Sequence, residues 1–302
     1  MIQHPLVSVV IATFNQEDFI ESAIRSVTAQ TYGLLEVIVV DDGSTDATNE
    51  RAAIVSDSRV RVIRTANAGV AAARNRGVAE ASGEILAFLD GDDEWEPQKL
   101  AEQLPVLTDA VAVGGRMRYV SATGRTLGTA GESTEGRMDD IRKAAFMPFP
   151  ISSMITRTET VRKVGGFDEA LTLVDDLDLL QRLAKLGRVT TVDSVVGSYR
   201  IHRSSGSASV RNYFRMQEYT RFLQARIETE GLSWTDFHRE HRRSVRMASS
   251  DTARYLYRSG GLAFAEGRRI EAAISLTGAL ILHPRYVLRR LARQRRRATR
   301  AS

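Results

Sequence analysis

Cysteine is absent from this chain of 302 residues, and aromatic side chains make up only 7% of it. The lack of cysteine excludes a disulfide framework and thiol chemistry, as fits a reducing compartment. No apolar run approaches the roughly 18 residues of a membrane span. The start, MIQHPLVSVV, has no basic region followed by an apolar signal core. These absences agree with a cytoplasmic protein, and the length of 302 residues leaves room for one large domain and an appendage.

Three carboxylates follow an apolar run in the first third of the chain. Residues 84–89 are almost continuously apolar, which is typical of a strand covered on both faces of a parallel sheet. Asp90, Asp92 and Asp93 come directly after it, where ligands bind in open α/β sheets. Asp90 and Asp92 are spaced to face one Mg or Mn ion, which binds few carboxylates plus substrate phosphates. A solvated acidic turn is the alternative for this motif alone.

The preceding residues repeat the pattern of buried strand, polar end and helix. Residues 7–12 and 36–40 are predicted strands, and the second ends in another acidic cluster, Asp41-Asp42. Asn15 is expected to cap a helix over residues 19–27, whose apolar positions recur every three or four residues. Asp42-Gly43 is also compatible with a hairpin turn, but the helical segment before it favours a βαβ unit.

A third short strand is predicted at residues 60–64, followed by an Ala-rich helix within residues 67–77. Arg74 in this helix is a candidate phosphate ligand, because a guanidinium binds phosphate through two parallel hydrogen bonds. The alternative for a single helical Arg is a solvated surface residue.

Beyond the acidic turn, residues 94–100 are expected to begin a helix with Pro97 in its first turn. Trp95 is expected to pack this segment onto the core, and stacking on a sugar or base is the alternative. Strands are predicted at residues 111–115 and 117–120, and a loop at residues 123–136.

A second carboxylate cluster lies in residues 173–183. Leucines at helical spacing mark a buried face there, and Asp175, Asp176 and Asp178 gather at the predicted helix start. One acid is a candidate general base, because a neighbouring carboxylate raises its pKa towards neutrality. The alternative is that the three acids only complement the helix dipole.

Five segments resemble the successive motifs of family 2 glycosyltransferases, in the family's order over roughly residues 5–205. They are VSVVIATFNQEDFIESAIRSVTAQTY, VIVVDDGSTDAT, NAGVAAARNRGVAEASGEILAFLDGDD, GGFDE and VDDLDLLQRL. The resemblance implies a GT-A fold of the α/β class, with a Rossmann-like, mostly parallel sheet flanked by helices. It implies a nucleotide-sugar-binding half at residues 1–100, an acceptor half at 101–210 and a helical extension with a basic tail at 211–302.

The resemblance also assigns roles to individual residues. The expected nucleotide-binding residues are Ala12, Thr13, Asn15, Asp42, Arg74 and Asp90, and the expected metal ligands are Asp92, Asp90 and His202. Asp42 would accept from the base, and Arg74 would contact the base or the diphosphate. Asp175 stands where the family usually has Glu, which makes Asp176 the expected catalytic base. Arg200 or His202 is expected near the diphosphate or metal.

The implied activity is inverting, metal-dependent transfer of a sugar from a nucleotide-sugar donor, expected to be UDP-linked. The acceptor is expected to be a glycan or lipid-linked precursor in cell-surface polysaccharide synthesis. Processive synthases carry membrane helices and a Gln-x-x-Arg-Trp motif, and neither Trp95 nor Trp234 lies in one. The alternatives are a nucleotidyltransferase, which needs a Gly-rich basic signature that residues 13–15 lack, and a non-catalytic sugar-nucleotide-binding protein.

The last third of the chain is rich in arginine. A helix pair is predicted within residues 255–284, and residues 285–297 form a cationic segment with no acid. Contact with an anionic membrane surface is the favoured interpretation, so the enzyme is expected at the inner face of the membrane. A solubilising tail is the next alternative, and nucleic acid is not an expected partner.

Overall fold

The computed structural model describes residues 4–138, 141, 147–171, 174–202, 269–282 and 287–288. The chain divides into two compact units: Met1–Lys143 with Met147–Arg200, and Ala144–Phe146 with Ile201–Ser302. The predicted basic tail at residues 285–297 lies outside the described residues except for Val287 and Leu288. Among the described residues, no helix is long and apolar enough to cross a membrane.

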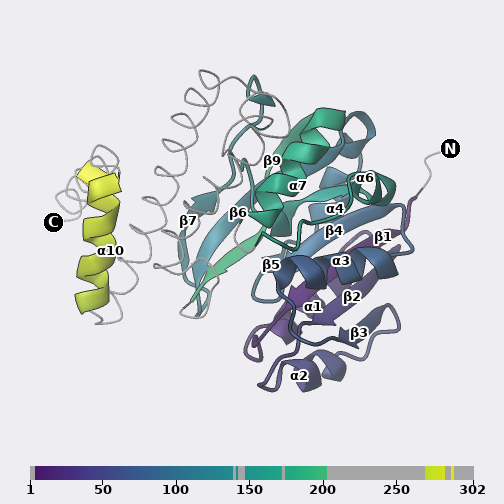
Figure 1. Ribbon diagram of the computed structural model, residues 1–302, viewed down its shortest axis with the longest axis horizontal. Helices are drawn as coiled ribbons and strands as arrows, with labels where there is room; N and C mark the ends of the chain where they lie inside the picture. Colours follow the sequence, from purple (N-terminus) through teal and green to yellow (C-terminus); the bar gives the residue numbers. More distant parts are fainter. Residues whose placement is uncertain are drawn as a thin grey trace. The chain divides into compact units, whose positions relative to one another are not determined.

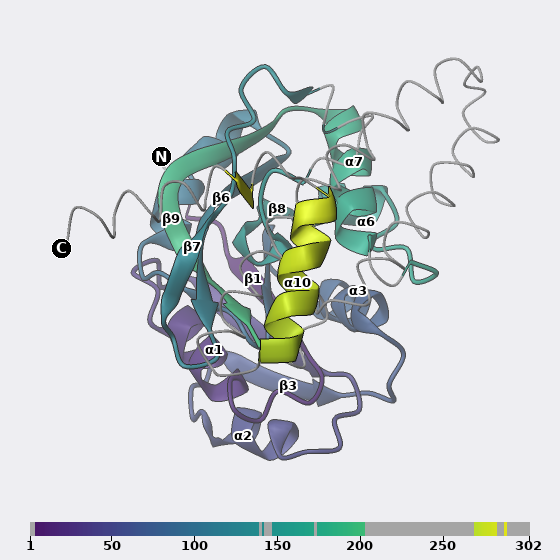
Figure 2. The same ribbon diagram turned by 90° about the vertical axis from the view of Figure 1, so that its left-hand side faces the viewer.

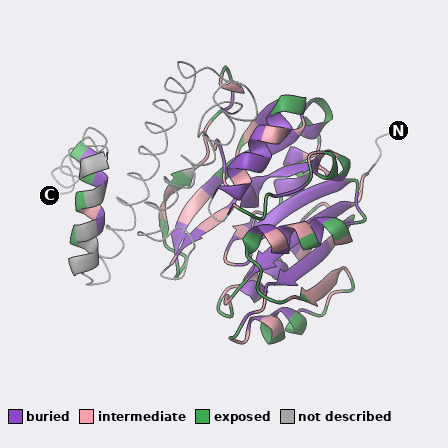
Figure 3. Ribbon diagram, in the orientation of Figure 1, coloured by how far each residue is buried: buried purple, intermediate pink, exposed green. Residues whose placement is uncertain are grey.

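Four parallel strands form the amino-terminal half of the first unit (Figure 1). They are β1 (Val7–Thr13), β2 (Leu35–Asp41), β3 (Val60–Arg64) and β4 (Ile85–Asp90), in the order β3-β2-β1-β4. Every residue of β1 is buried, which explains its continuous apolar run. Figure 3 shows the same burial along the neighbouring strands. The strands predicted for this half are confirmed.

Helices cover both faces of this half-sheet. Helices α1 (Ile20–Thr28) and α2 (Thr48–Ile54) pack on the face that carries Val9 and Ile11. Helix α3 (Val70–Glu80) packs on the opposite face, and Figure 2 shows α1 and α3 on either side of β1. The contact with α3 requires a glycine, because a Cβ at Gly77 would lie 2.2 Å from Val10 Cγ1. Helix α3 therefore approaches the sheet closely.

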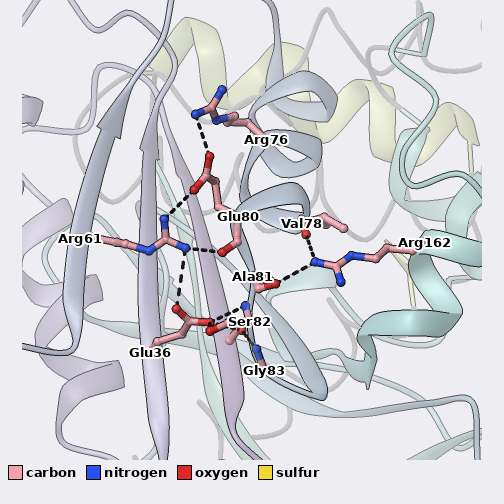
Figure 4. Close-up of polar contacts among 10 residues, drawn as sticks. Glu36, Arg61, Arg76, Val78, Glu80, Ala81, Ser82, Gly83 and Arg162 are labelled. Carbon is pink, nitrogen blue, oxygen red and sulfur yellow. Dashed lines mark hydrogen bonds and ion pairs between the residues drawn. The ribbon is translucent and has the colours of Figure 1, made fainter.

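Arginines hold the carboxyl end of α3 in place (Figure 4). Arg162 donates to the carbonyl oxygens of Val78 at 3.0 Å and Ala81 at 2.7 Å, so it satisfies acceptors that the end of a helix leaves open. Arg61 pairs with Glu80 at 2.8 Å and joins the helix to β3. These contacts fix the direction of the α3 axis, and therefore the position of its amino-terminal end.

Further strands continue the sheet beyond β4, most of them in antiparallel pairs. They are β8 (Ile155–Arg157), β6 (Ala112–Ser121), β9 (Val189–Ile201) and β5 (Glu94–Trp95), and β7 (Thr126–Ala130) pairs with β6. The helical segments of this part are α4 (Lys99–Gln103), η1 (Val106–Asp109), η2 (Ile151–Ser153), α6 (Thr158–Lys163) and α7 (Asp175–Leu186). In the second unit, α10 (Arg269–Leu282) lies within the region predicted to form a helix pair.

Three local predictions in this part were wrong. Residues 94 and 95 form a strand because they pair with Ser198 and Gly197 of β9, and the helix begins only at Lys99. The two strands predicted around residues 111–120 are the single strand β6, and the predicted loop at 123–136 contains β7. Trp95 does pack onto the core as expected, and its indole Nε1 donates to the Ser152 carbonyl oxygen at 2.6 Å.

A lysine is completely buried beside this tryptophan. Lys99 Nζ donates to Gln103 Oε1 at 2.6 Å and lies 4.1 Å from the centre of the Trp95 ring. Burial without a carboxylate partner lowers the pKa of Lys99 well below its usual value.

The lowered pKa of Lys99 predicts a stability that increases with pH. From the native pKa up to the unfolded value of about 10.4, the unfolded chain binds more protons than the native protein. The free energy of unfolding therefore rises towards pH 10, and Lys99→Met should remove this component. Urea denaturation between pH 7 and 10 measures the difference. Lys163→Met, at an exposed position, is the control; equal pH slopes for Lys99→Met and wild type would contradict the prediction.

Candidate active site

The carboxyl ends of three strands meet at one edge of the sheet. The register places Thr13 beside Asp41 and Ala12 beside Asp90. The Gly91 N–H donates to the Ala12 carbonyl oxygen at 3.1 Å, so the acidic turn after β4 lies against the end of β1. Two segments that are distant in sequence thus line one edge, as the pattern of polar strand ends predicts.

The Asp42 side chain organises the segment that leads into α3. Its Oδ1 accepts from the Ala68 N–H at 2.9 Å and its Oδ2 from the Gly69 N–H at 2.8 Å. The Thr65 hydroxyl lies 3.5 Å from the same Oδ1, so Oδ2 is the oxygen with more acceptor capacity left for a ligand. The role of Asp42 towards a nucleotide base stays a prediction.

Asn15 joins the loop after β1 to the loop after β2. Its Oδ1 accepts from the Thr45 N–H at 2.8 Å, and its own N–H donates to Ser44 Oγ at 2.9 Å. The prediction that Asn15 caps a helix was wrong, because α1 begins at Ile20 with Phe19 before it. The backbone of Asn15 is left-handed, with φ of 54°, a conformation that asparagine tolerates.

The sequence did not single out Phe14, which the structure leaves 44% exposed at this edge. Ala12 and Thr13 beside it are buried. An exposed aromatic ring at the end of a central strand is available to stack on a planar ligand. Its position directly after an apolar run was the only signal in the sequence.

The carboxylates of the acidic turn, residues 90–93, differ in burial. Asp90 and Asp92 are half-buried, whereas Asp93 is 1% exposed and its Oδ1 accepts from the Arg200 N–H at 2.8 Å. Burial, followed by the charges of Asp92 and Asp90, raises the pKa of Asp93 well above its usual value. Asp93 therefore serves the structure of the turn, and the other two acids remain partly accessible.

The donor set of this turn fits a magnesium or manganese ion. Within the residues that the structure describes, no three His, Asp or Glu side chains gather closely enough to hold a metal by themselves. Asp90 and Asp92 offer hard oxygen ligands, and such ions commonly bind one or two carboxylates with substrate phosphates completing the shell. His202 follows the last residue of β9 and belongs to the second unit, so its role stays a prediction.

A buried arginine joins the acidic turn to α7. Arg74 Nη2 lies 2.6 Å from Asp90 Oδ1, and Arg74 Nη1 lies 2.6 Å from Asp175 Oδ2. Its side chain is 6% exposed, and its Cζ lies 5.4 Å from the centre of the Phe167 ring. The alternative of a solvated surface arginine was therefore wrong. Its contact with a base or diphosphate stays a prediction.

The acids at the start of α7 have different surroundings. Asp175 is buried, and burial, with the nearby charges of Asp176 and Asp90, raises its pKa to about 6 despite Arg74. Asp178 is buried and accepts from Arg182 Nε at 2.8 Å. Asp176 is half-buried, and its Oδ1 accepts from the adjacent Leu177 N–H at 2.8 Å. Of the three, Asp176 is the acid that remains accessible to a substrate.

The sequence model of glycosyl transferase family 2 matches residues 8–164. An uncharacterized glycosyltransferase of Nostoc sp. (strain PCC 7120) is 31% identical over 245 residues, which cover 76% of this chain and 75% of that protein. The chain belongs to glycosyltransferase family 2. It is therefore a transferase enzyme, as predicted. A second family relative, the succinoglycan biosynthesis protein ExoO of Rhizobium meliloti, is 33% identical over 68% of this chain and 63% of its own length.

Solved structures show the fold of this family 2 glycosyltransferase. Staphylococcus aureus TarS, in complex with UDP-GlcNAc, matches with a TM-score of 0.60 and 20% identity over 91% of this chain and 79% of its own. The mannosyltransferase PcManGT of Pyrobaculum calidifontis, in complex with GDP-Man and Mn²⁺, matches with a TM-score of 0.60 and 21% identity over 93% and 87%. The predicted GT-A fold is confirmed.

The position of Arg74 between two acids predicts a large stability effect. Arg74→Met leaves Asp90 and Asp175 without their shared cation, and breaking a buried ion pair in this way costs about 3–5 kcal/mol of unfolding free energy. Urea denaturation measures the loss, and Asp175→Asn in the same background should restore part of it. The control is Arg76→Met on the same helix, whose exposed pair with Glu80 should contribute little to stability. Equal small losses for both arginines would contradict the prediction.

Proposed function

We propose that this family 2 enzyme is an inverting, metal-dependent glycosyltransferase with a nucleotide-sugar donor. The donor is UDP-linked, and the acceptor is a glycan or lipid-linked precursor in cell-surface polysaccharide synthesis. One observation carries the proposal: Arg74 ties Asp90 of the acidic turn to Asp175, directly beside the half-buried Asp176. This contact holds a candidate metal site and a candidate base in one rigid group.

The relatives support the substrate class. ExoO is named for the biosynthesis of succinoglycan, and the structures of TarS and PcManGT are complexes with nucleotide sugars. The TarS complex with UDP-GlcNAc supports a UDP-linked donor, and the GDP-Man of PcManGT is the competing choice. The cationic residues 285–297 support contact with an anionic membrane at its inner, cytoplasmic face.

In this mechanism Ala12, Thr13, Asn15 and Asp42 bind the nucleotide. Asp90 and Asp92 hold a Mg or Mn ion, which when bound neutralises charge on the departing diphosphate. Asp176 accepts the proton of the acceptor hydroxyl on the opposite face of the sugar. The new bond from that oxygen to the anomeric carbon forms as the bond to the diphosphate breaks, which inverts the configuration through an oxocarbenium-like transition state.

A thermal-shift panel tests the proposal as a whole. The full chain is heated with UDP-Glc, UDP-GlcNAc, GDP-Man or no ligand, each with MnCl₂ or with EDTA. A ligand that binds the native state raises the melting temperature by mass action, so the responding nucleotide identifies the donor class. If none of the nucleotide sugars raised the melting temperature in a manganese-dependent way, the proposal of metal-dependent transfer would be overturned.

Asp92→Asn is expected to abolish transfer and manganese-dependent nucleotide binding. The variant loses a ligand charge from a half-buried turn position while the melting temperature in EDTA stays near that of wild type. Calorimetric titration of nucleotide with and without manganese measures the effect. Undiminished manganese-dependent binding would remove Asp92 from the metal site.

Asp176→Asn is expected to keep donor affinity and lose turnover by about two to four orders of magnitude, the usual share of a positioned base. The measurement is kcat beside the dissociation constant of the donor. Should turnover stay near wild type, the base lies elsewhere, and Asp175 and Asp178 are the next residues to test.

A further inference from the structure

Arg200 of β9 contacts three consecutive residues of the acidic turn. Its Nε donates to the Asp92 carbonyl oxygen at 2.9 Å, and its Nη2 pairs with the Glu94 carboxylate. Its backbone N–H donates to Asp93 Oδ1 at 2.8 Å. The Arg200 side chain is 8% exposed, whereas its partner Glu94 is 38% exposed. Arg200 thus holds residues 92–94, although it follows them by more than 100 positions in the sequence.

Further contacts fix the guanidinium itself. Its Nη1 lies 3.2 Å from the Ala122 carbonyl oxygen and 3.4 Å from that of Ser121, at the end of β6. Its Cζ lies 5.0 Å from the centre of the Phe19 ring. A guanidinium has five N–H donors in a rigid plane, so several acceptors on different segments determine its position closely. The expectation that Arg200 approaches the diphosphate or metal stays a prediction, and these contacts within the protein are what the structure shows of the residue.

The contact with Asp92 bears on the metal site because it acts on the backbone. The direction of a carboxylate depends on the backbone that carries it, and the peptide oxygen of Asp92 is the group that Arg200 holds. Pairing between β5 and β9, at Glu94 with Ser198 and Trp95 with Gly197, extends the same attachment along the chain. The charge of Arg200 also offsets the repulsion among acids crowded into residues 90–94.

We infer that Arg200 is a positioning residue for the metal site: it holds the backbone of Asp92 so that the Asp92 carboxylate is preorganised for a divalent cation. The inference rests on the proposed metal-dependent transfer. Groups that orient metal ligands in this way typically contribute about 10- to 100-fold to metal affinity.

The experiment compares four full-length variants with wild type: Arg200→Lys, Arg200→Met, Glu94→Gln and Arg162→Lys. The probe is Mn²⁺ in the presence of saturating UDP or GDP, and electron paramagnetic resonance of free Mn²⁺ gives its dissociation constant. Thermal melting in EDTA reports the stability of each protein without metal. Arg162 is the matched control, because it also donates hydrogen bonds to backbone carbonyl oxygens. Its acceptors lie at the end of α3 and not at the acidic turn.

Arg200→Lys and Arg200→Met are expected to weaken Mn²⁺ binding by about tenfold or more, because an ammonium cannot reproduce the planar set of contacts. Glu94→Gln removes the anionic partner of the guanidinium and should give a smaller loss. Arg162→Lys should lower the melting temperature without changing Mn²⁺ affinity. If Arg200→Met does not fold, Arg200→Lys and Glu94→Gln still decide the question.

Wild-type Mn²⁺ affinity in both Arg200→Lys and Glu94→Gln would overturn the inference. A second result would also overturn it. If Arg162→Lys and Arg200→Lys lowered the melting temperature equally and also weakened Mn²⁺ binding equally, Arg200 would act only through stability. The proposed function fails separately: wild-type protein that binds no Mn²⁺ with either nucleotide would overturn metal dependence, and this inference with it.

Discussion

The ion pairs of Arg74 with Asp90 and Asp175 connect the two halves of the first unit. Burying the charges of Arg74 and Asp175 is costly, and each must keep its partners for the arrangement to be stable. Arg74 and Asp175 are 101 positions apart, and their contact brings the start of α7 to the acidic turn after β4. The elements that carry the candidate base and the candidate metal ligands therefore have one relative position, fixed by charge pairing in a water-poor interior.

Close packing of α3 makes this contact possible. Gly77 lies one turn after Arg74 and contacts Val10, so the helix sits nearer to β1 than any larger residue would allow. Arg162 and Arg61 hold the other end of the helix (Figure 4). Helix α3 is held at its carboxyl end and packs closely on the sheet near its middle. The position of Arg74 at the carboxyl edge of the sheet therefore has little freedom. Steric fit thus sets the geometry in which the electrostatic contacts operate.

The sequence predicted the features that arise from local patterns. Continuous apolar runs indicated β1, β2 and β4, and the parallel pairing that such runs favour placed Asp42 and Asp90 at one edge. Features that depend on distant pairing were missed. Residues 94–95 form a strand only because β9 lies beside them, and Arg74 is buried only because Asp175 reaches it. The Asn15 side chain accepts a hydrogen bond from the loop after β2 and does not cap the nearer helix. The spacing of residues around Asn15 does not indicate this contact.

The two arginines explain why a crowded set of carboxylates is available for chemistry. Arg74 pairs with the inner acid Asp175, and Arg200 holds the turn in which Asp93 is buried. The half-buried acids that remain are Asp90, Asp92 and Asp176. Besides burial, the charges of Asp92 and Asp90 raise the pKa of Asp93, and those of Asp176 and Asp90 raise the pKa of Asp175, so the acids around the turn repel one another even with Arg74 present. In the proposed function a divalent cation relieves this repulsion, so burial of the inner acids and metal binding at the outer ones would act together.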